Sequence, residues 1–296
     1  MRNKNLISIG WVLLWSLSIS LSLAINKILG QSLNTVMIVF SRIGFGLILF
    51  APFLLRAKAS DFKTQKFPLH ISRVLFTCGS MLCTYYAYSK LEISFATSLG
   101  FTAPLITTVF SIFFLGESVR WDKWIVILMG FSGVIIIAHP TNFPFSWAVV
   151  VALCANLFAS SAIILLKKLT RTESVLTIMI YLNVLSFLFI GSFASTVFEM
   201  PSTKELMLLM CLGGFASVSQ FCYAQALKNG NPSVVAPFEY SRLVFAIPIG
   251  YLLFSELPTK QTLVGSVVII ASNLLLTYRE ARLGRNQNGP ESQKIE

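Results

Sequence analysis

The 296-residue sequence is poor in charged side chains. Only 12% of its residues are Asp, Glu, Lys or Arg, about half the share typical of soluble domains. It has only two histidines, His70 and His139, and no aspartate inside its long apolar runs. It also has no H-E-x-x-H motif and no phosphate-binding glycine loop. These absences argue against an enzyme and an ATP-driven pump, and we expect no cofactor.

Cysteine is also scarce, and its spacing points to no redox or metal chemistry. None of the five cysteines forms a C-x-x-C pair, and all lie inside apolar segments. Cysteines in membrane segments usually behave as small hydrophobic residues. The sequence therefore predicts neither a metal site nor a redox centre at Cys78, Cys83, Cys154, Cys211 and Cys222.

What the sequence does contain is long apolar runs, with 55% hydrophobic residues and a mean hydropathy of +0.75. A helix that spans a bilayer needs about 20 mostly apolar residues. The turns between the runs are short, so no loop can hold a soluble domain. The sequence predicts ten spans, at Leu6–Leu29, Leu33–Leu55, Ile71–Tyr88, Ser94–Leu115, Trp124–Ala138, Phe145–Leu166, Val175–Val197, Leu206–Leu227, Val234–Phe254 and Leu263–Tyr278.

The formal net charge of +11 would suggest a nucleic-acid partner in a soluble protein, but here it indicates orientation instead. With the N-terminus in the cytoplasm, cytoplasmic segments collect sixteen Lys and Arg residues and outer loops only four. Positive charge in short loops marks the cytoplasmic side. We therefore expect both termini in the cytoplasm, the lipid bilayer as partner and no nucleic acid. The first span has a poor cleavage site and is expected to be retained, and residues 281–296 are expected to be disordered.

Ten spans divide into two fives, and repeating an odd number of spans inverts the second copy in the membrane. A shift of 139 residues places Ser94 on Ser233 and Glu117 on Glu256. A shift of 141 residues places Lys27 on Lys168. The predicted fold is therefore an all-α polytopic membrane protein with two inverted five-helix repeats, at residues 1–141 and 142–280. Such repeats are the signature of secondary transporters.

Three charged residues lie deep in the predicted spans: Arg42, Glu239 and Arg242. A charge at the bilayer centre costs about 2.5–3.5 kcal/mol on insertion scales. Glu239 and Arg242 are three residues apart and share a helix face. They either form a structural ion pair or line a cavity and offer opposite charges to a substrate. Arg42 has three candidate partners: Glu239, a substrate carboxylate and backbone carbonyls.

Further polar and proline residues are candidates for the same cavity. Tyr86 and Gln220 either line the path or, as is common for membrane tyrosines, lie at the interface. Asn156 and Asn183 either line the path or bond across helices. Proline bends a helix and frees a carbonyl, and paired broken helices are typical of transporter sites. Prolines interrupt spans that correspond in the repeat, at Pro104, Pro237 and Pro248.

These features resemble the EamA-type members of the drug/metabolite transporter superfamily over about residues 6–279. The resemblance is carried by Phe40-Ser41-Arg42, by Leu115-Gly116-Glu117, and by Ala236-Pro237-Phe238-Glu239-Tyr240 with Phe254-Ser255-Glu256-Leu257-Pro258. The last passage is similar to bacterial S-adenosylmethionine uptake transporters of this family.

The resemblance implies a secondary transporter of the bacterial inner membrane that moves a small organic metabolite by alternating access. S-adenosylmethionine uptake or exchange is the first expectation, with riboflavin-like compounds and amino acids as alternatives. A membrane-embedded enzyme or a channel is the alternative of another class. The expected substrate-binding residues are Glu239, Arg242, Tyr240, Arg42, Tyr86, Gln220 and Asn156. The sequence leaves the oligomeric state open, a monomer included.

Overall fold

The computed structural model describes residues 2–55, 64–115, 121–137, 146–170, 172–229 and 238–287. Within these ranges every regular element is a helix, which confirms the all-α prediction. The helices are α1 (Arg2–Leu29), α2 (Thr35–Leu55), α3 (Phe67–Lys90), α4 (Ile93–Gly100), α5 (Ala103–Leu115), α6 (Trp121–Ile137), α7 (Trp147–Leu169), α8 (Val175–Ala194), α9 (Thr203–Asn229), α11 (Ser241–Phe254) and α12 (Lys260–Gln287).

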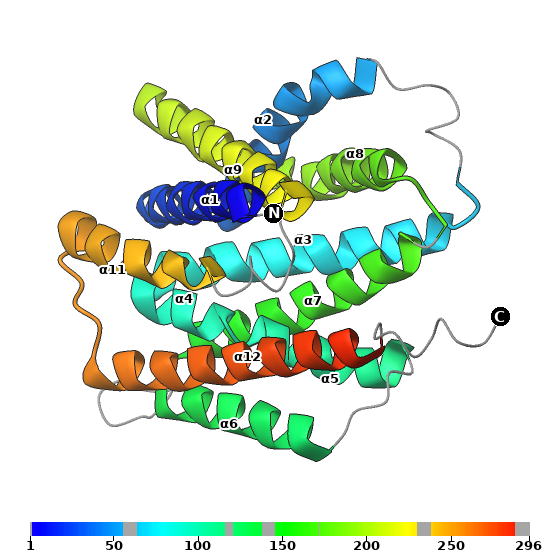
Figure 1. The fold of residues 1–296 in the computed structure, drawn as a ribbon. Coiled ribbons are helices and arrows are strands. Elements are labelled where there is room, and N and C mark those ends of the chain that lie inside the picture. The colour runs from blue at the N-terminus through cyan, green and yellow to red at the C-terminus, as the bar shows by residue number, and fades with distance from the viewer. Residues whose placement is uncertain are drawn as a thin grey trace.

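The helices correspond to the ten predicted spans, with α4 and α5 together forming the fourth. Figure 1 shows α1 beside α9, α3 beside α7 and α12 beside α6. Exchanging the two halves turns the α1–α9 contact into the α3–α7 contact. It also turns α2–α9 into α3–α8, and α5–α7 into α1–α11. The packing therefore follows the two-fold relation that the repeat predicts.

The fourth span is broken at Phe101 and Thr102. The backbone N–H of each residue bonds three residues back, to Ser98 (3.2 Å) and Leu99 (3.0 Å) respectively. Pro104, the second residue of α5, has no N–H with which to continue the α4 ladder. The predicted interruption near Pro104 is therefore confirmed.

The ninth span is interrupted at the corresponding position. Phe238 and Glu239 are helical, Tyr240 is a turn, and α11 begins at Ser241. Tyr240 follows Phe101 by the 139 residues of the repeat. The helix α11 continues through Pro248, whereas Pro237 lies outside the described residues. Both halves thus carry a break at one repeat position, next to which the predicted charges lie.

The outer surface of the bundle suits lipid. Large apolar side chains are exposed on several helices, among them Phe113, Trp147 and Leu252. Among the described residues, five segments are long and apolar enough to cross a membrane, and four shorter apolar helices accompany them. Lipid tails cover such surface without the free-energy penalty that water would impose. The chain is a multi-pass membrane protein.

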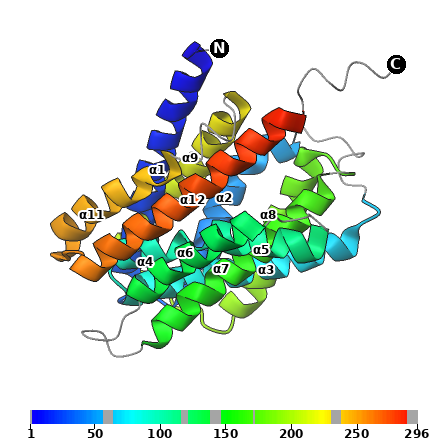
Figure 2. The same cartoon turned by 60° about the horizontal axis from the view of Figure 1, so that its bottom comes forward.

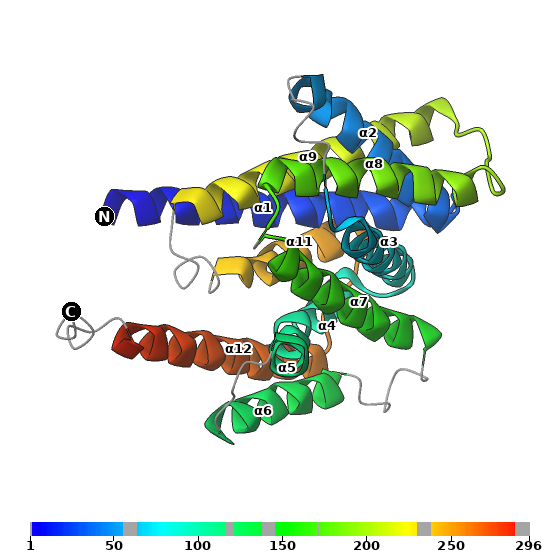
Figure 3. The ribbon, with the colours of Figure 1, turned by 90° about the vertical axis from the view of Figure 1, so that its right-hand side faces the viewer.

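The start of α1 and the end of α12 lie at the same side of the bundle (Figures 2 and 3). The helix α12 runs to Gln287, so it extends seven residues into the segment 281–296 that the sequence predicted to be disordered. Arg, Glu, Ala and Leu, which favour helix, dominate residues 279–283. Glu117 and His139 lie outside the described residues.

Candidate functional site

The two breaks meet at the centre of the bundle, where α4 packs against α11. The rings of Phe101 and Tyr240 lie 5.0 Å apart in an edge-to-face arrangement. Because the two residues are repeat equivalents, this contact lies near the two-fold axis that relates the halves. Tyr240, predicted to bind substrate, is thus brought to the meeting point of both broken spans.

Glu239 is held by α9. The hydroxyl of Tyr223 donates a hydrogen bond of 2.9 Å to Glu239 Oε1. The Tyr223 ring in turn packs against Trp15 of α1, with ring centroids 5.1 Å apart. This carboxyl is therefore fixed by a neutral partner, which leaves its charge to be balanced by another group.

Arg242 packs on aromatic rings. Its guanidinium carbon lies 5.2 Å from the ring centroid of Phe101 and 5.9 Å from that of Trp15. A Cβ atom built on Gly100 would lie 3.2 Å from Arg242 Nη2. Gly100 is the repeat equivalent of Glu239. At the position where the second half carries the Glu239 carboxylate, the first half carries a glycine. The missing side chain leaves room for the guanidinium of Arg242.

Glu239 and Arg242 do not form the ion pair that their spacing offered as one alternative. Among the described residues, side-chain ion pairs within 4.0 Å are Lys27–Glu256 and His70–Glu173. Arg242 Nε is buried and has no hydrogen-bond partner in the part of the chain that the structure describes. The site thus holds both charges on neighbouring elements, each bound to aromatic or hydroxyl groups instead of to the other.

Asn156 lies beside the first break. Its side-chain amide donates to the Leu99 carbonyl oxygen (2.8 Å) and to Thr102 Oγ1 (2.7 Å). Asn273 of α12 likewise donates to the Phe101 carbonyl oxygen, at 2.9 Å. These amides satisfy acceptors at the break. Asn156 therefore bonds across helices, which is one of the two alternatives that the sequence left open. It lies next to the candidate site.

Among the described residues, no hydrogen bond or ring contact joins the three other predicted residues to Glu239, Tyr240 or Arg242. Arg42 lies 5.8 Å from the Tyr85 ring and donates to Met81 Sδ at 3.3 Å, both on α3. Among the described residues, Arg42 bonds neither to Glu239 nor to a backbone carbonyl, and a substrate carboxylate stays a proposal. Tyr86 is partly buried beside the central core, and Gln220 is exposed on α9. The structure therefore brings together Glu239, Tyr240 and Arg242, with Asn156 beside the first break.

A polar cluster ties three chain segments together at one end of the bundle. Lys27 of α1 pairs with Glu256, in the turn after α11, and donates to the Leu91 carbonyl oxygen at 2.6 Å. Glu256 Oε2 accepts from the backbone N–H of Ile93 at 3.0 Å, at the start of α4. Glu256 therefore caps a helix and also joins the two halves.

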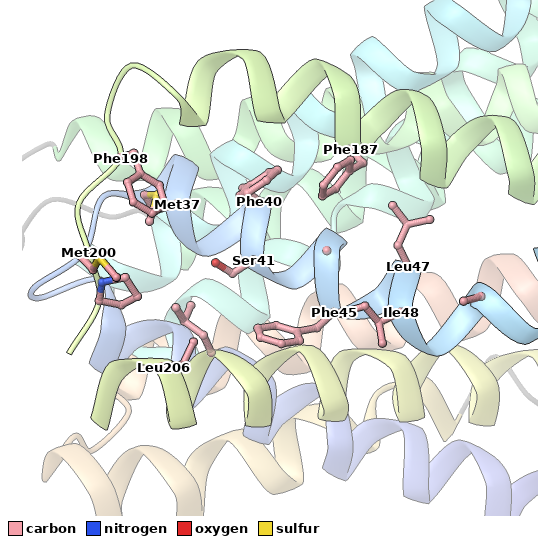
Figure 4. A pocket seen from close by; sticks show the side chains of 14 residues that line it. Met37, Phe40, Ser41, Phe45, Leu47, Ile48, Phe187, Phe198, Met200 and Leu206 are labelled. Carbon is pink, nitrogen blue, oxygen red and sulfur yellow. The ribbon is translucent and has the colours of Figure 1, made fainter. Parts of the chain in front are cut away.

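A cavity of about 770 Å³ lies between α2, α8 and α9. In Figure 4, Phe40 and Phe187 flank it on one side and Phe45 and Leu206 on the other. Ser41 contributes the one polar side chain of its lining. The wall offers no charge to a polar metabolite, and none of the predicted site residues lines it. This groove suits lipid tails better than a charged substrate.

Two residues of the site escaped prediction: Trp15 and Phe101. Both could have been found from the repeat. The 139-residue shift places Phe101 on Tyr240, and the 141-residue shift places Trp15 on Asn156. Because Tyr240 and Asn156 are predicted site residues, the repeat indicates Phe101 and Trp15 as further candidates.

A family model, the EamA-like transporter family, matches residues 6–139 and again residues 146–278. The two matches correspond to the two five-helix halves. A solved crystal structure covers 94% of this chain and 99% of its own, with a TM-score of 0.60 at 18% identity. At that identity, it supports the fold alone.

Curated relatives include an S-adenosylmethionine uptake transporter of Rickettsia conorii, which is 30% identical over 277 residues, 94% of each chain. A riboflavin transporter of Vibrio cholerae is 27% identical over 93% of this chain and 95% of its own. A pseudopaline exporter of Pseudomonas aeruginosa is 26% identical over 88% of this chain and 93% of its own. All three are transport proteins, which confirms the prediction that the chain is not an enzyme.

Proposed function

Because the chain belongs to the EamA-like transporter family, whose relatives move small metabolites, we propose that it takes up S-adenosylmethionine or exchanges it across the membrane. The observation that carries this substrate is the 30% identity with S-adenosylmethionine uptake transporters over 94% of both chains. The chemistry of the central site agrees with it. S-adenosylmethionine carries a sulfonium, an amine and a carboxylate, and the site offers a carboxylate, aromatic rings and a guanidinium.

Each charged residue of the site has a complementary group on this substrate. Glu239, bound by the neutral Tyr223 hydroxyl, attracts the amine or the sulfonium. Arg242, with no carboxylate within 4.0 Å among the described residues, receives the carboxylate. Tyr240 packs on Phe101 at the meeting point of the breaks and lies next to Glu239 in the chain.

The remaining predicted residues have a place farther along the path. Asn156 stabilises the first break beside the site by donating hydrogen bonds to two acceptors there, the Leu99 carbonyl oxygen and Thr102 Oγ1. Tyr86 and Gln220 contribute polar groups from α3 and α9. Arg42, held beside the Tyr85 ring, attracts the substrate carboxylate before it reaches the centre.

Transport follows from rocking the two inverted halves about the central site. We place residues 1–141 in one half and 142–280 in the other, in the inner membrane of a bacterium. Both termini lie in the cytoplasm in this proposal. Support comes from the sixteen-to-four bias of basic residues and from the start of α1 and the end of α12 lying at one side of the bundle (Figure 3).

The test is uptake of labelled S-adenosylmethionine by proteoliposomes that contain the purified protein. Saturable uptake, inhibited by excess unlabelled substrate, is the expected result. Loading the vesicles with S-adenosylhomocysteine separates exchange, which this loading accelerates, from net uptake, which it does not.

Correctly inserted protein that takes up no S-adenosylmethionine would contradict the substrate. Uptake of riboflavin or of an amino acid in the same vesicles would then assign one of the alternatives while preserving the transporter class. Protein-free vesicles provide the baseline for each compound.

A further inference from the structure

The side chain of Arg242 occupies a position built from aromatic faces. Trp15 of α1 and Phe101, between α4 and α5, flank its guanidinium at 5.9 and 5.2 Å. Tyr223 packs on Trp15, and Tyr240 packs on Phe101. Aromatic faces of this kind hold organic cations, quaternary ammonium groups included.

The same side chain has unused hydrogen-bonding capacity. Arg242 Nε is buried and bonds to no group in the part of the chain that the structure describes. No carboxylate lies within 4.0 Å of the guanidinium among those residues. A buried guanidinium normally pairs with an anion. The guanidinium of Arg242 instead lies against aromatic rings, and its buried Nε has no acceptor among the described residues.

We propose that Trp15 and Phe101 form the subsite for the cationic group of the substrate, and that Arg242 fills this subsite while it is empty. This inference rests on the proposed function and names the substrate class: an organic cation that also carries a carboxylate. The substrate cation replaces the guanidinium between the rings, and the displaced Arg242 pairs with the substrate carboxylate. A cation without a carboxylate must displace Arg242 without offering it a partner, so it binds weakly.

Binding of tetramethylammonium chloride to the purified protein, measured by isothermal titration calorimetry, tests the subsite. Arg242→Ala vacates the space between the rings and removes a repelling charge. It should bind tetramethylammonium at least about tenfold more tightly than the unmodified protein does. Arg242→Gln, which keeps more of the side-chain packing, should show the same direction of change and covers the case in which Arg242→Ala does not fold.

The matched variants lie one helical turn apart on α1. Adding Trp15→Leu to the Arg242 variant should abolish the gain in tetramethylammonium binding. Adding Trp11→Leu should retain it, because Trp11 packs edge-to-face on Phe221 instead. Equal binding by the unmodified protein and both Arg242 variants would overturn the proposal, as would a gain that survives Trp15→Leu.

Substrate discrimination gives a second readout. The rings take the sulfonium in this proposal, and the amine is left to Glu239. S-adenosylhomocysteine keeps the amine but lacks the sulfonium, so Trp15→Leu should weaken the binding of S-adenosylmethionine by about tenfold and that of S-adenosylhomocysteine by less than about threefold. Equal losses for both compounds would overturn the assignment of Trp15. If the unmodified protein transports no S-adenosylmethionine, the proposed function fails, and the tetramethylammonium measurement still decides the subsite.

Discussion

The ion pair between Lys27 and Glu256 should stabilise the packing of the two halves. Its side chains are only 11% and 17% exposed, and each makes a further hydrogen bond, to the Leu91 carbonyl oxygen and the Ile93 N–H. Glu256→Gln keeps an acceptor for Ile93 but removes the charge. The difference between charge-assisted and neutral hydrogen bonds is about 1–2 kcal/mol.

Lys27→Met should lower the stability further, because it leaves the largely buried Glu256 carboxylate without its counter-ion. Removing one partner of a buried pair costs about 3–5 kcal/mol. The slight exposure favours the lower end of that range. At roughly 2 °C of melting temperature for each kcal/mol, Glu256→Gln should lower the Tm by about 2–4 °C and Lys27→Met by about 6 °C.

The assay is thermal unfolding of the purified protein in detergent, with both single variants and the double variant. The double variant should be less destabilised than the sum of the single variants, by about 1–2 kcal/mol. Lys90→Met, which removes an exposed cation from the last turn of α3, is the control for charge alone and should leave the Tm unchanged. Strict additivity of the two single variants would refute the ion pair.

Two further predictions concern residues beside α4. Burial and the Glu256 carboxylate raise the pKa of Glu92, in the turn before α4, while Lys27 opposes the shift. The native protein therefore binds this proton more tightly than the unfolded chain, so Glu92→Gln should raise the Tm at pH 8. The gain should shrink as the pH falls to the ordinary value of 4.5. Asn156→Leu should lower the Tm by about 2–4 °C, since Thr102 Oγ1 and the Leu99 carbonyl lose a donor.

Each of these two predictions has its own check. If Glu92→Gln raised the Tm by the same amount at pH 4.5 and pH 8, the gain would not come from the ionisation of Glu92. For Asn156→Leu the control is Asn183→Leu, because the described hydrogen bond of Asn183 stays within α8, to the Met179 carbonyl oxygen. If Asn156→Leu and Asn183→Leu lower the Tm equally, the cross-helix hydrogen bonds of Asn156 contribute nothing measurable to stability.

The spans and the two-fold relation of the halves could be predicted because both depend on features that a sequence displays directly. A run of about 20 apolar residues has few alternatives to a membrane helix. The odd number of spans in each half then required inversion. Pro104 also predicted its break, since a proline removes a backbone donor wherever it lies.

The partners of the charged residues could not be predicted in the same way. The spacing of Glu239 and Arg242 allows an ion pair, but contacts from α9 and α1 decide otherwise: Tyr223 binds the carboxyl and Trp15 flanks the guanidinium. The contact between Trp15 and Arg242 joins residues more than 200 positions apart, and the contact between Tyr223 and Glu239 joins two different spans. The repeat was the one sequence feature that pointed to Trp15.

The most direct test of the central site is equilibrium binding of labelled S-adenosylmethionine to the purified protein and to Glu239→Gln. Glu205→Gln is the matched control, because Glu205 is bound by Ser32 and Ser202 at the start of α9, away from the breaks. We expect Glu239→Gln to weaken saturable binding by at least about tenfold and Glu205→Gln to leave it unchanged. Equal affinity for Glu239→Gln and the unmodified protein would contradict the assignment of Glu239 to the substrate site.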